Sequence, residues 1–343
     1  MTAPLLEVEG VTKHYAVRGA LFGEKKHVHA LDDVSLSVRS RQTLAVVGES
    51  GCGKTTLARC LVRLVEPTRG TIRLAGRNLT NPSPAEKREI PRLIQIVFQD
   101  PYASLNPRRT IFQTVGDPLR LHQAATRSQR REKVASLLAS VGIGPQLMDR
   151  LPHELSGGQR QRIAISRALA VGPQVIVCDE PVSALDVSVQ AQVINLLKRL
   201  QAEHGMSYVF ITHDLRLVRS LADTVAVMYL GQIVELAEIG DFKARIKHPY
   251  SQALFSATPQ AARAGAGKPK RIVLSGDVPS PIDPPSGCRF HTRCPYVQSI
   301  CRESEPALRP IGTRLVRCHF ADQAGFPPEP AANSPFPLGE GDR

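Results

Sequence analysis

The sequence contains no tryptophan, and only six tyrosines and ten phenylalanines occur among its 343 residues. This scarcity leaves little material for a platform on which bases could stack, which speaks against single-stranded nucleic acid as the main target. No stretch approaches the ~20 apolar residues that a membrane-spanning helix needs. Residues 1–10 lack a basic start followed by an apolar run, so we expect no signal peptide and a chain that remains on the cytoplasmic side.

The overall composition is otherwise that of a globular protein. Apolar residues make up 42% and charged residues 22% of the chain, which excludes disorder over the whole length and permits a large core without disulfides or metal staples. The 44 Lys and Arg residues outnumber the 31 Asp and Glu residues, giving a net charge of +13. This excess favours an anionic partner, namely a nucleotide, nucleic acid or an acidic membrane surface, without choosing among them.

Buried-strand patterns alternate with helical patterns along the chain. Residues 5–9 and 30–38 alternate apolar and polar side chains, as half-buried strands do. Continuous apolar runs, typical of buried parallel strands, occur at residues 44–47, 95–98, 174–178 and 207–212. Apolar side chains at helical spacing mark residues 134–141 and 189–200, which are followed by Gly142 and Gly205. The alternation predicts a three-layer α/β domain that binds its ligand at the carboxyl ends of the strands.

The composition changes near residue 256 and predicts four parts. We expect the principal domain to span residues 1–255 and a small, basic, flexible linker to span 256–271. Residues 272–320 are rich in Pro and Cys with little periodicity, which predicts a small irregular lobe. The proline-rich end, residues 321–343, is expected to be a disordered tail.

Residues 48–55 read Gly-Glu-Ser-Gly-Cys-Gly-Lys-Thr and match the phosphate-binding pattern G-x-x-x-x-G-K-[ST]. Glycines allow backbone N–H groups to converge on phosphate oxygens, and the following helix adds its positive N-terminus. Lys54 can reach the β- and γ-phosphates, and Thr55 can offer its hydroxyl oxygen to Mg²⁺. The expected nucleotide contacts are Gly48, Ser50, Gly51, Cys52, Gly53, Lys54, Thr55 and Thr56.

One phosphate-binding loop leaves GTPases, kinases, helicases and transporters open, so a second element is needed. Residues 175–180 form an apolar run that ends in Asp179 and Glu180. Asp179 is predicted to join the Mg²⁺ shell, as the Walker B Asp does in such sites. Glu180, one residue further on, is placed to polarise an attacking water.

A second glycine turn, Leu-Ser-Gly-Gly-Gln at residues 155–159, follows Pro-His-Glu and precedes a helix expected to begin near Arg160. A serine hydroxyl and two glycines before a helix form another anion cradle. The two anion cradles of a single chain cannot easily reach the same phosphate from opposite sides. A second copy of the protein removes this difficulty, because each copy can then supply one of the two cradles. With this motif, residues 5–255 resemble the ATP-binding-cassette (ABC) ATPase family.

The resemblance implies a P-loop NTPase fold with a β-rich N-terminal part and a helical subdomain at about residues 100–160. It also implies that ATP is held between the Walker A loop (residues 48–55) of one cassette and the signature turn (residues 155–159) of another. It also implies roles for residues outside the Walker motifs. Tyr15 is similar to the aromatic residue that stacks on adenine, and Gln99 to the glutamine that senses Mg²⁺ and water. Ser156 and Gly158 resemble the γ-phosphate contacts made across the dimer, Asp186 belongs to a loop that crosses the interface, and His213 resembles the switch histidine.

Two further stretches resemble the ATPases of peptide and nickel importers. They are residues 99–108 and 278–291, and residues 21–23 resemble an insertion of the "F-type" subunit of dipeptide and oligopeptide systems. The resemblance implies a homologous ATPase partner, with a heterodimer favoured over a homodimer. It also implies two membrane permeases, an indirect link to a substrate-binding protein, a peripheral location on the cytoplasmic face of the membrane, and no nucleic acid.

The substrate and the neighbouring classes stay open at this stage. Dipeptides, oligopeptides, nickel and glutathione are all candidate substrates for such an importer. A non-transport alternative is the accessory ATPase of a phosphonate-degrading complex, which resembles this cassette closely. A nucleic-acid-linked cassette, suggested by the charge of +13, is disfavoured because no long coiled-coil insertion is present.

Four of the seven cysteines, Cys288, Cys294, Cys301 and Cys318, lie close together near the end of the sequence. Their gaps of five, six and sixteen residues include no C-x-x-C pair, so the spacing is not that of a zinc ribbon. Four thiolates could hold a [4Fe–4S] cluster, with His291 and His319 as alternative ligands. The other interpretation is four reduced thiols that pack a small lobe.

Overall fold

The computed structural model describes residues 3–17, 26–122, 126–257 and 272–328. The insertion at residues 21–23, most of the expected linker and the last fifteen residues of the expected tail lie outside the described residues. Within the described residues, none of the helices combines the length and the apolar character needed to cross a membrane.

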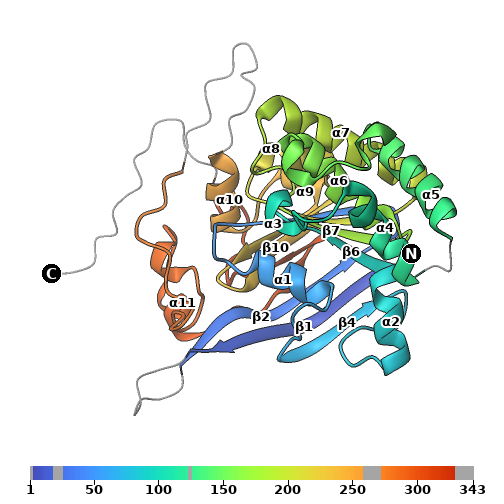
Figure 1. Ribbon diagram of the computed structural model, residues 1–343. Helices are drawn as coiled ribbons and strands as arrows, with labels where there is room; N and C mark the ends of the chain where they lie inside the picture. The colour runs from blue at the N-terminus through green and yellow to red at the C-terminus, as the bar shows by residue number, and fades with distance from the viewer. Residues whose placement is uncertain (1–2, 18–25, 123–125, 258–271, 329–343) are drawn as a thin grey trace, which may run out of the picture.

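The principal sheet has eight strands in the order β11-β12-β10-β9-β3-β8-β7-β6 (Figure 1). Five neighbouring strands are parallel: β3 (Thr43–Val47), β6 (Ile94–Val97), β7 (Val175–Asp179), β8 (Ser207–Thr212) and β9 (Thr224–Tyr229). Three antiparallel strands complete it: β10 (Gln232–Glu238), β11 (Arg309–Ile311) and β12 (Arg314–Val316). The four continuous apolar runs of the sequence are therefore all parallel strands, as predicted.

A second, antiparallel sheet lies below the first in Figure 1, with the order β2-β1-β4-β5. Its strands are β1 (Leu6–Ala16), β2 (His27–Val38), β4 (Arg69–Leu74) and β5 (Arg77–Asn78), and α2 (Pro84–Leu93) follows them. Helix α1 (Lys54–Leu61) packs between the sheets, because Leu57 and Leu61 share one apolar core with Leu6 of β1 and Val46 of β3. The β-rich N-terminal part is thus a layer of its own.

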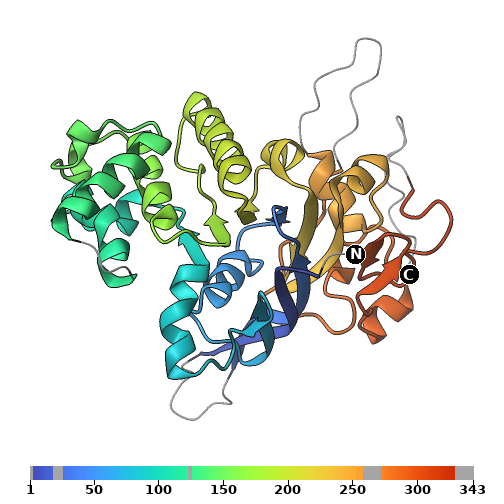
Figure 2. The same cartoon turned by 90° about the vertical axis from the view of Figure 1, so that its right-hand side faces the viewer.

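Helices cover the opposite face of the principal sheet. Ile176 and Cys178 of β7 face a core built with α6 (Gly157–Leu169) and α7 (Val187–His204), whereas Val175 and Val177 face α1. This alternation buries both faces and confirms the predicted three layers. The helical subdomain projects to the left in Figure 2 and comprises α3 (Pro101–Ser104), α4 (Ile111–His122), α5 (Arg127–Ser140), and 3₁₀ turns at Pro145–Leu147 and Pro152–Glu154.

The carboxyl-terminal lobe shares its core with the rest of the protein. Phe290 is buried against Tyr229 of β9 and Tyr250 of α10, with ring centroids 5.3 and 5.4 Å apart. Strand β12 extends the principal sheet, pairing Val316 with Glu235 of β10. The remaining elements here are α8 (Leu215–Leu221), α9 (Ile239–Ala244), α10 (Pro249–Ser256), the 3₁₀ turn His291–Arg293 and α11 (Ser299–Glu303).

The structure corrects the expectation of a purely irregular lobe that ends at residue 320. The lobe contains two regular strands, β11 and β12, which pair with each other. Strand β12 also pairs with β10, about eighty residues earlier in the chain, and no local sequence pattern could reveal that contact. Ala321 is fully buried, and Phe326 packs against the same small apolar cluster. The ordered chain therefore continues to residue 328, beyond the point where we expected a disordered tail.

Candidate nucleotide-binding site

The Walker A loop joins the wholly buried strand β3 to helix α1, and two of its three glycines, Gly48 and Gly53, meet backbone that leaves no room for side chains. A Cβ on Gly53 would overlap the carbonyl oxygen of Ala30, and a Cβ on Gly48 would overlap that of Met228. Gly53 is the N-cap of α1 with φ at 108° and offers no side-chain cap. The first N–H groups of α1 are therefore left for an external acceptor, as a phosphate site requires.

Lys54 lies over this loop. Its Nζ donates hydrogen bonds of 2.9 Å to the carbonyl oxygens of Gly48 and Glu49, and only 5% of the residue is exposed. Cys52 is buried in the same loop, and burial raises the pKa of its thiol. Ser50 and Gly51 are exposed, and Thr56 is half-buried in the first turn of α1. The predicted residues thus follow one another through the loop and into the first turn of α1.

Thr55 and Asp179 bring two oxygen donors together at the start of α1. The Thr55 hydroxyl donates to the Asp179 carboxylate at 3.3 Å. Burial raises the pKa of Asp179, and the Thr55 hydrogen bond opposes that effect. A hydroxyl and a carboxylate are the hard oxygen ligands that Mg²⁺ prefers, so these residues fit the predicted ion.

Three neighbouring strands end in the predicted catalytic side chains. Gln99 follows β6, Glu180 follows β7 and His213 follows β8. One carboxylate oxygen of Glu180 accepts a hydrogen bond from the Gln99 amide and also meets Nδ1 of His213, each at 3.1 Å. The backbone of Glu180 has φ at 47°, a left-handed conformation that costs a non-glycine residue about 1 kcal/mol or more.

The signature turn differs from the expectation. Helix α6 begins at Gly157 rather than near Arg160, and Ser156 is its N-cap. The Ser156 hydroxyl accepts from the N–H of Gln159 at 3.3 Å, and the Gln159 side chain accepts from the N–H of Ser156 at 2.9 Å. The two glycines lie inside the first helical turn, and Gly158 faces Val189 of α7. The serine is exposed and already satisfies its own helix.

Among the described residues, no hydrogen bond or ion pair joins Ser156, Asp186 or Tyr15 to the Walker A loop. Asp186 is exposed immediately before α7. Tyr15 lies on strand β1, paired with Val28. Its ring is 37% exposed and carries the Lys13 ammonium 5.0 Å from its centroid. Within one chain, therefore, the structure assembles the Walker and switch residues but not these three.

The four late cysteines gather within the lobe. Burial, together with the charges of Cys288, Cys318 and Cys301, raises the pKa of Cys294 to about 12. Tetrahedral zinc at a Zn–S distance of ~2.3 Å requires sulfurs about 3.8 Å apart. In the part of the chain that the structure describes, no three of these sulfurs lie within 4.8 Å of one another, so a compact zinc site is not preformed.

A different trio, His14, His29 and Asp32, does bring ligand atoms within 4.8 Å of one another. Both imidazoles lie 3.1 Å from the Asp32 carboxylate, which also bonds the guanidinium of Arg289. Burial raises the pKa of Asp32, but the bonds to Arg289 and the histidines outweigh burial and lower it. The arginine already shares the carboxylate, so this trio ties the lobe to β2 as an ion-pair centre.

Sequence reasoning missed the groups that support the Walker A loop from behind. The carbonyl oxygens of Met228 and Ala30 pack against its glycines, and the Tyr250 hydroxyl accepts from the N–H of Glu49 at 2.9 Å. No local pattern marks these residues, because their role comes from a backbone atom or from a contact about two hundred residues away.

Comparison with known proteins agrees with this fold and site. The family model described as "ABC transporter" matches residues 31–183, and the model "Oligopeptide/dipeptide transporter, C-terminal region" matches residues 234–301. The oligopeptide transport ATP-binding protein AppF of Bacillus subtilis is 48% identical over 319 residues, covering 92% of this chain and 97% of AppF. The dipeptide transport ATP-binding protein DppF of Escherichia coli is 48% identical, covering 93% and 95%.

The solved structures extend the agreement to three dimensions. The ATP-binding cassette MJ0796, solved as a dimer in a post-hydrolysis state with ADP and Pi, has a TM-score of 0.61 and 30% identity, covering 68% of this chain and 98% of that one. The fold and the Walker motifs define an ATP-binding P-loop cassette. The chain belongs to the ABC transporter ATPase family, in the branch whose relatives carry the oligopeptide/dipeptide transporter carboxyl-terminal region.

Proposed function

We propose that this chain is the ATP-hydrolysing subunit that powers import of di- and oligopeptides through a membrane transporter. The relatives that match nearly its whole length are named as oligopeptide and dipeptide transport ATP-binding proteins. The match to the carboxyl-terminal region supports this branch over a phosphonate-degrading accessory ATPase. The names of the relatives favour peptides over nickel or glutathione.

The observation that carries the catalytic part is the convergence of Gln99 and His213 on one oxygen of Glu180. Glu180 holds and orients the attacking water, Gln99 links that carboxylate to the ion site, and His213 supports the γ-phosphate. Lys54 neutralises the phosphates. Thr55, Asp179 and Gln99 would hold Mg²⁺, which would supply further charge neutralisation when bound. Catalysis by such a site consists mainly of positioning and charge stabilisation.

We assign Ser156, Gly158 and Asp186 to the nucleotide of a neighbouring cassette. Among the described residues, no hydrogen bond or ion pair joins Ser156 or Asp186 to the Walker A loop of their own chain, and both residues are exposed and accessible to a partner. A homologous ATPase is the favoured partner, and a second copy of this chain is the alternative. Tyr15, exposed on β1, is the proposed adenine contact.

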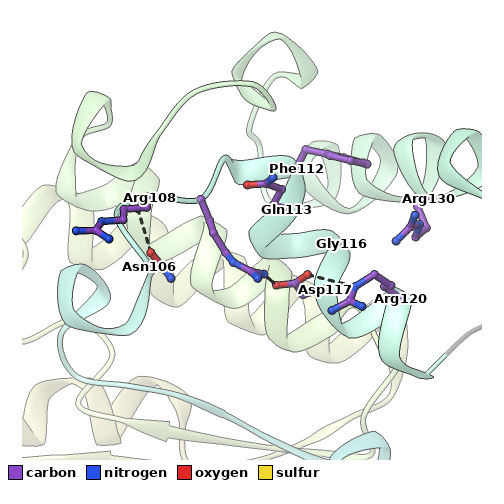
Figure 3. Close-up of a pocket in the computed structure, with 9 residues that line it drawn as sticks. Asn106, Arg108, Phe112, Gln113, Gly116, Asp117, Arg120 and Arg130 are labelled. Carbon is purple, nitrogen blue, oxygen red and sulfur yellow. Dashed lines mark hydrogen bonds and ion pairs between the residues drawn. The ribbon is translucent and has the colours of Figure 1, made fainter.

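The permease contact is assigned to the Gln99–Arg108 region. A hollow of about 530 Å³ on the helical subdomain adjoins this region, and its lining includes Arg108, Arg109, Asp117, Arg120 and Arg130. Figure 3 shows Arg120 beside Asp117 in this hollow. Arg109 and Arg120 both pair with Asp117, which leaves the rim basic. Such a rim suits a polar or acidic segment of a permease at the cytoplasmic face of the membrane. The substrate-binding protein is then an indirect partner.

The proposed function is tested by peptide uptake in cells that lack this chain. Wild-type protein is expected to restore uptake of a labelled dipeptide or tripeptide, whereas Glu180→Gln is not, although the purified variant still binds ATP. Wild-type hydrolysis by purified Glu180→Gln would remove the assigned role of this glutamate. Normal peptide uptake without the chain would overturn the transport assignment.

We further propose that Cys288, Cys294, Cys301 and Cys318 hold a [4Fe–4S] cluster. The fold brings these four residues into one small lobe, where the sulfurs of Cys294 and Cys318 each feel the charge of at least two of the other cysteines, and that of Cys288 feels the charge of Cys301. The ultraviolet–visible absorption spectrum and the iron content of anaerobically purified protein test for this cluster. A colourless, iron-free sample excludes the cluster, and Cys294→Ser is expected to lose it.

A further inference from the structure

An arginine of the carboxyl-terminal lobe reaches into the Walker A loop. Arg293 and Glu49 lie 244 positions apart in sequence, yet Nη1 donates to one Glu49 oxygen at 2.7 Å and Nη2 to the other at 3.2 Å. The arginine side chain is 8% exposed and the glutamate 29%. A two-point pair whose arginine is buried is stronger and more directional than a fully exposed ion pair.

Glu49 is held at further atoms besides its carboxylate. Its N–H donates to the Tyr250 hydroxyl at 2.9 Å, and its carbonyl oxygen accepts the Lys54 ammonium at 2.9 Å. A change in the position of Glu49 therefore moves an acceptor of the lysine assigned to the phosphates. The link runs from Arg293 through Glu49 to Lys54.

The guanidinium also contacts an aromatic ring of the principal sheet. It lies 5.9 Å from the centroid of the Tyr229 ring, which Phe290 contacts edge-on at 5.3 Å. Four residues earlier, Arg289 donates to the carbonyl oxygen of Leu230 at 2.5 Å. The neighbouring Gly231 N–H donates to the carbonyl oxygen of Cys52 at 2.9 Å, again in the Walker A loop. Two arginines of the lobe thus support one phosphate-binding turn.

We propose that Arg293 is a positioning residue of the nucleotide site, so that the carboxyl-terminal lobe sets the affinity of the Walker A loop for the phosphate chain of ATP and ADP. This inference rests on the proposed nucleotide site but adds a group outside the cassette motifs. Because Arg293 touches the loop and not the reacting atoms, its loss weakens nucleotide binding more than it slows the chemical step.

The test measures nucleotide affinity of the full-length chain and steady-state ATP hydrolysis of the assembled transporter. Arg293→Ala and Glu49→Gln are each expected to raise the Kd for a fluorescent ATP analogue about tenfold. The KM for ATP should rise equally while kcat stays within about twofold. The double variant should be little worse than either single one, because both remove the same pair. Arg293→Lys keeps the charge but cannot bond both oxygens, so it should fall between.

Arg309→Ala is the matched control. Arg309 pairs with Asp322 at 3.0 Å and bonds the backbone of His319, all within the lobe, so its loss should leave Kd and KM unchanged. An equal rise in KM for Arg309→Ala would overturn the proposal, because the effect would then be general damage to the lobe. If Arg293→Ala fails to fold, Glu49→Gln decides, since its partly exposed side chain tolerates the change.

Lys54→Ala separates the two levels of the argument. If Lys54→Ala binds nucleotide normally, the nucleotide site itself is wrongly assigned. If Lys54→Ala loses binding while Arg293→Ala and Glu49→Gln bind as wild type does, only the role of Arg293 is refuted.

Discussion

The protein contains two glycine turns that each open a helix, and the structure builds them in opposite ways. At the Walker A turn, Gly53 offers no side-chain cap to α1, and neighbouring carbonyl groups exclude a side chain at this position. At the signature turn, Ser156 caps α6 with its own hydroxyl, and Gly157 lies in the helix with Leu185 no nearer than 3.5 Å to where its Cβ would be.

The difference shows which turn can act alone. The Walker A turn leaves N–H groups unsatisfied and is supported from behind, so it is a preformed phosphate cradle. The signature turn satisfies its own helix and is exposed, so it needs a nucleotide delivered by another subunit before its serine has a second role. The two turns look similar in the sequence. The Walker A turn corresponds to a complete phosphate site, whereas the signature turn corresponds to half of one.

The largest expected difference between the two turns comes from replacing one glycine in each turn with alanine. Gly53→Ala should weaken ATP binding more than a hundredfold, because the φ of 108° and the Ala30 carbonyl group both oppose a Cβ. Gly157→Ala should leave ATP binding of the isolated chain unchanged and raise stability by about 0.5 kcal/mol, since alanine suits a helix. Fluorescent-nucleotide titration and urea unfolding measure the two results. Equal effects at the two positions would contradict the comparison.

A second substitution separates capping from phosphate contact at the signature turn. Aspartate caps helices as well as serine does, so Ser156→Asp should unfold within about 0.5 kcal/mol of wild type. Its negative charge opposes a γ-phosphate, so ATP turnover of the assembled transporter should fall on the order of tenfold to a hundredfold. Ser156→Ala is the reciprocal control and should cost about 1 kcal/mol of stability. Full turnover by Ser156→Asp would place the serine outside the nucleotide site.

The smallest expected effect concerns the buried support behind the Walker A turn. His248 is fully buried beside Tyr250, and burial lowers its pKa to about 3. Below pH 6.5 this histidine binds a proton in the unfolded chain but stays neutral in the folded protein. The contribution of His248 to the free energy of unfolding is therefore complete above pH 6.5 and is lost as the pH falls towards 3. Wild type should lose about 1.4 kcal/mol per pH unit relative to His248→Asn.

Urea unfolding at pH 7.5 and 5.5 measures this loss. Glu235, whose pKa burial raises, accepts from the N–H groups of Lys247 and His248 and acts in the opposite sense, gaining stability as the pH falls. Glu235 is present in both wild type and His248→Asn, so its contribution cancels when the free energies of unfolding of the two proteins are subtracted. Parallel pH profiles for wild type and His248→Asn would refute the assignment.

Much of the catalytic arrangement could be predicted because it follows from local patterns. The runs that end before Gln99, at Asp179 and at Thr212 are wholly or largely apolar, and parallel strands place their carboxyl ends at one edge. The meeting of Gln99, His213 and Glu180 follows from that rule. Strand β1 was predicted only in part, because its end near Tyr15 is polar and half-exposed and does not alternate.

The amino-acid sequence by itself determined that this protein has a phosphate-binding turn, a Walker B carboxylate pair and a signature serine, because each is written in a few consecutive residues. Only the tertiary structure decided that β12 extends the principal sheet, that Ser156 caps its own helix, and that Arg293 holds Glu49. Contacts between residues tens to hundreds of positions apart depend on how buried surfaces pack, and no local pattern records which surfaces will meet.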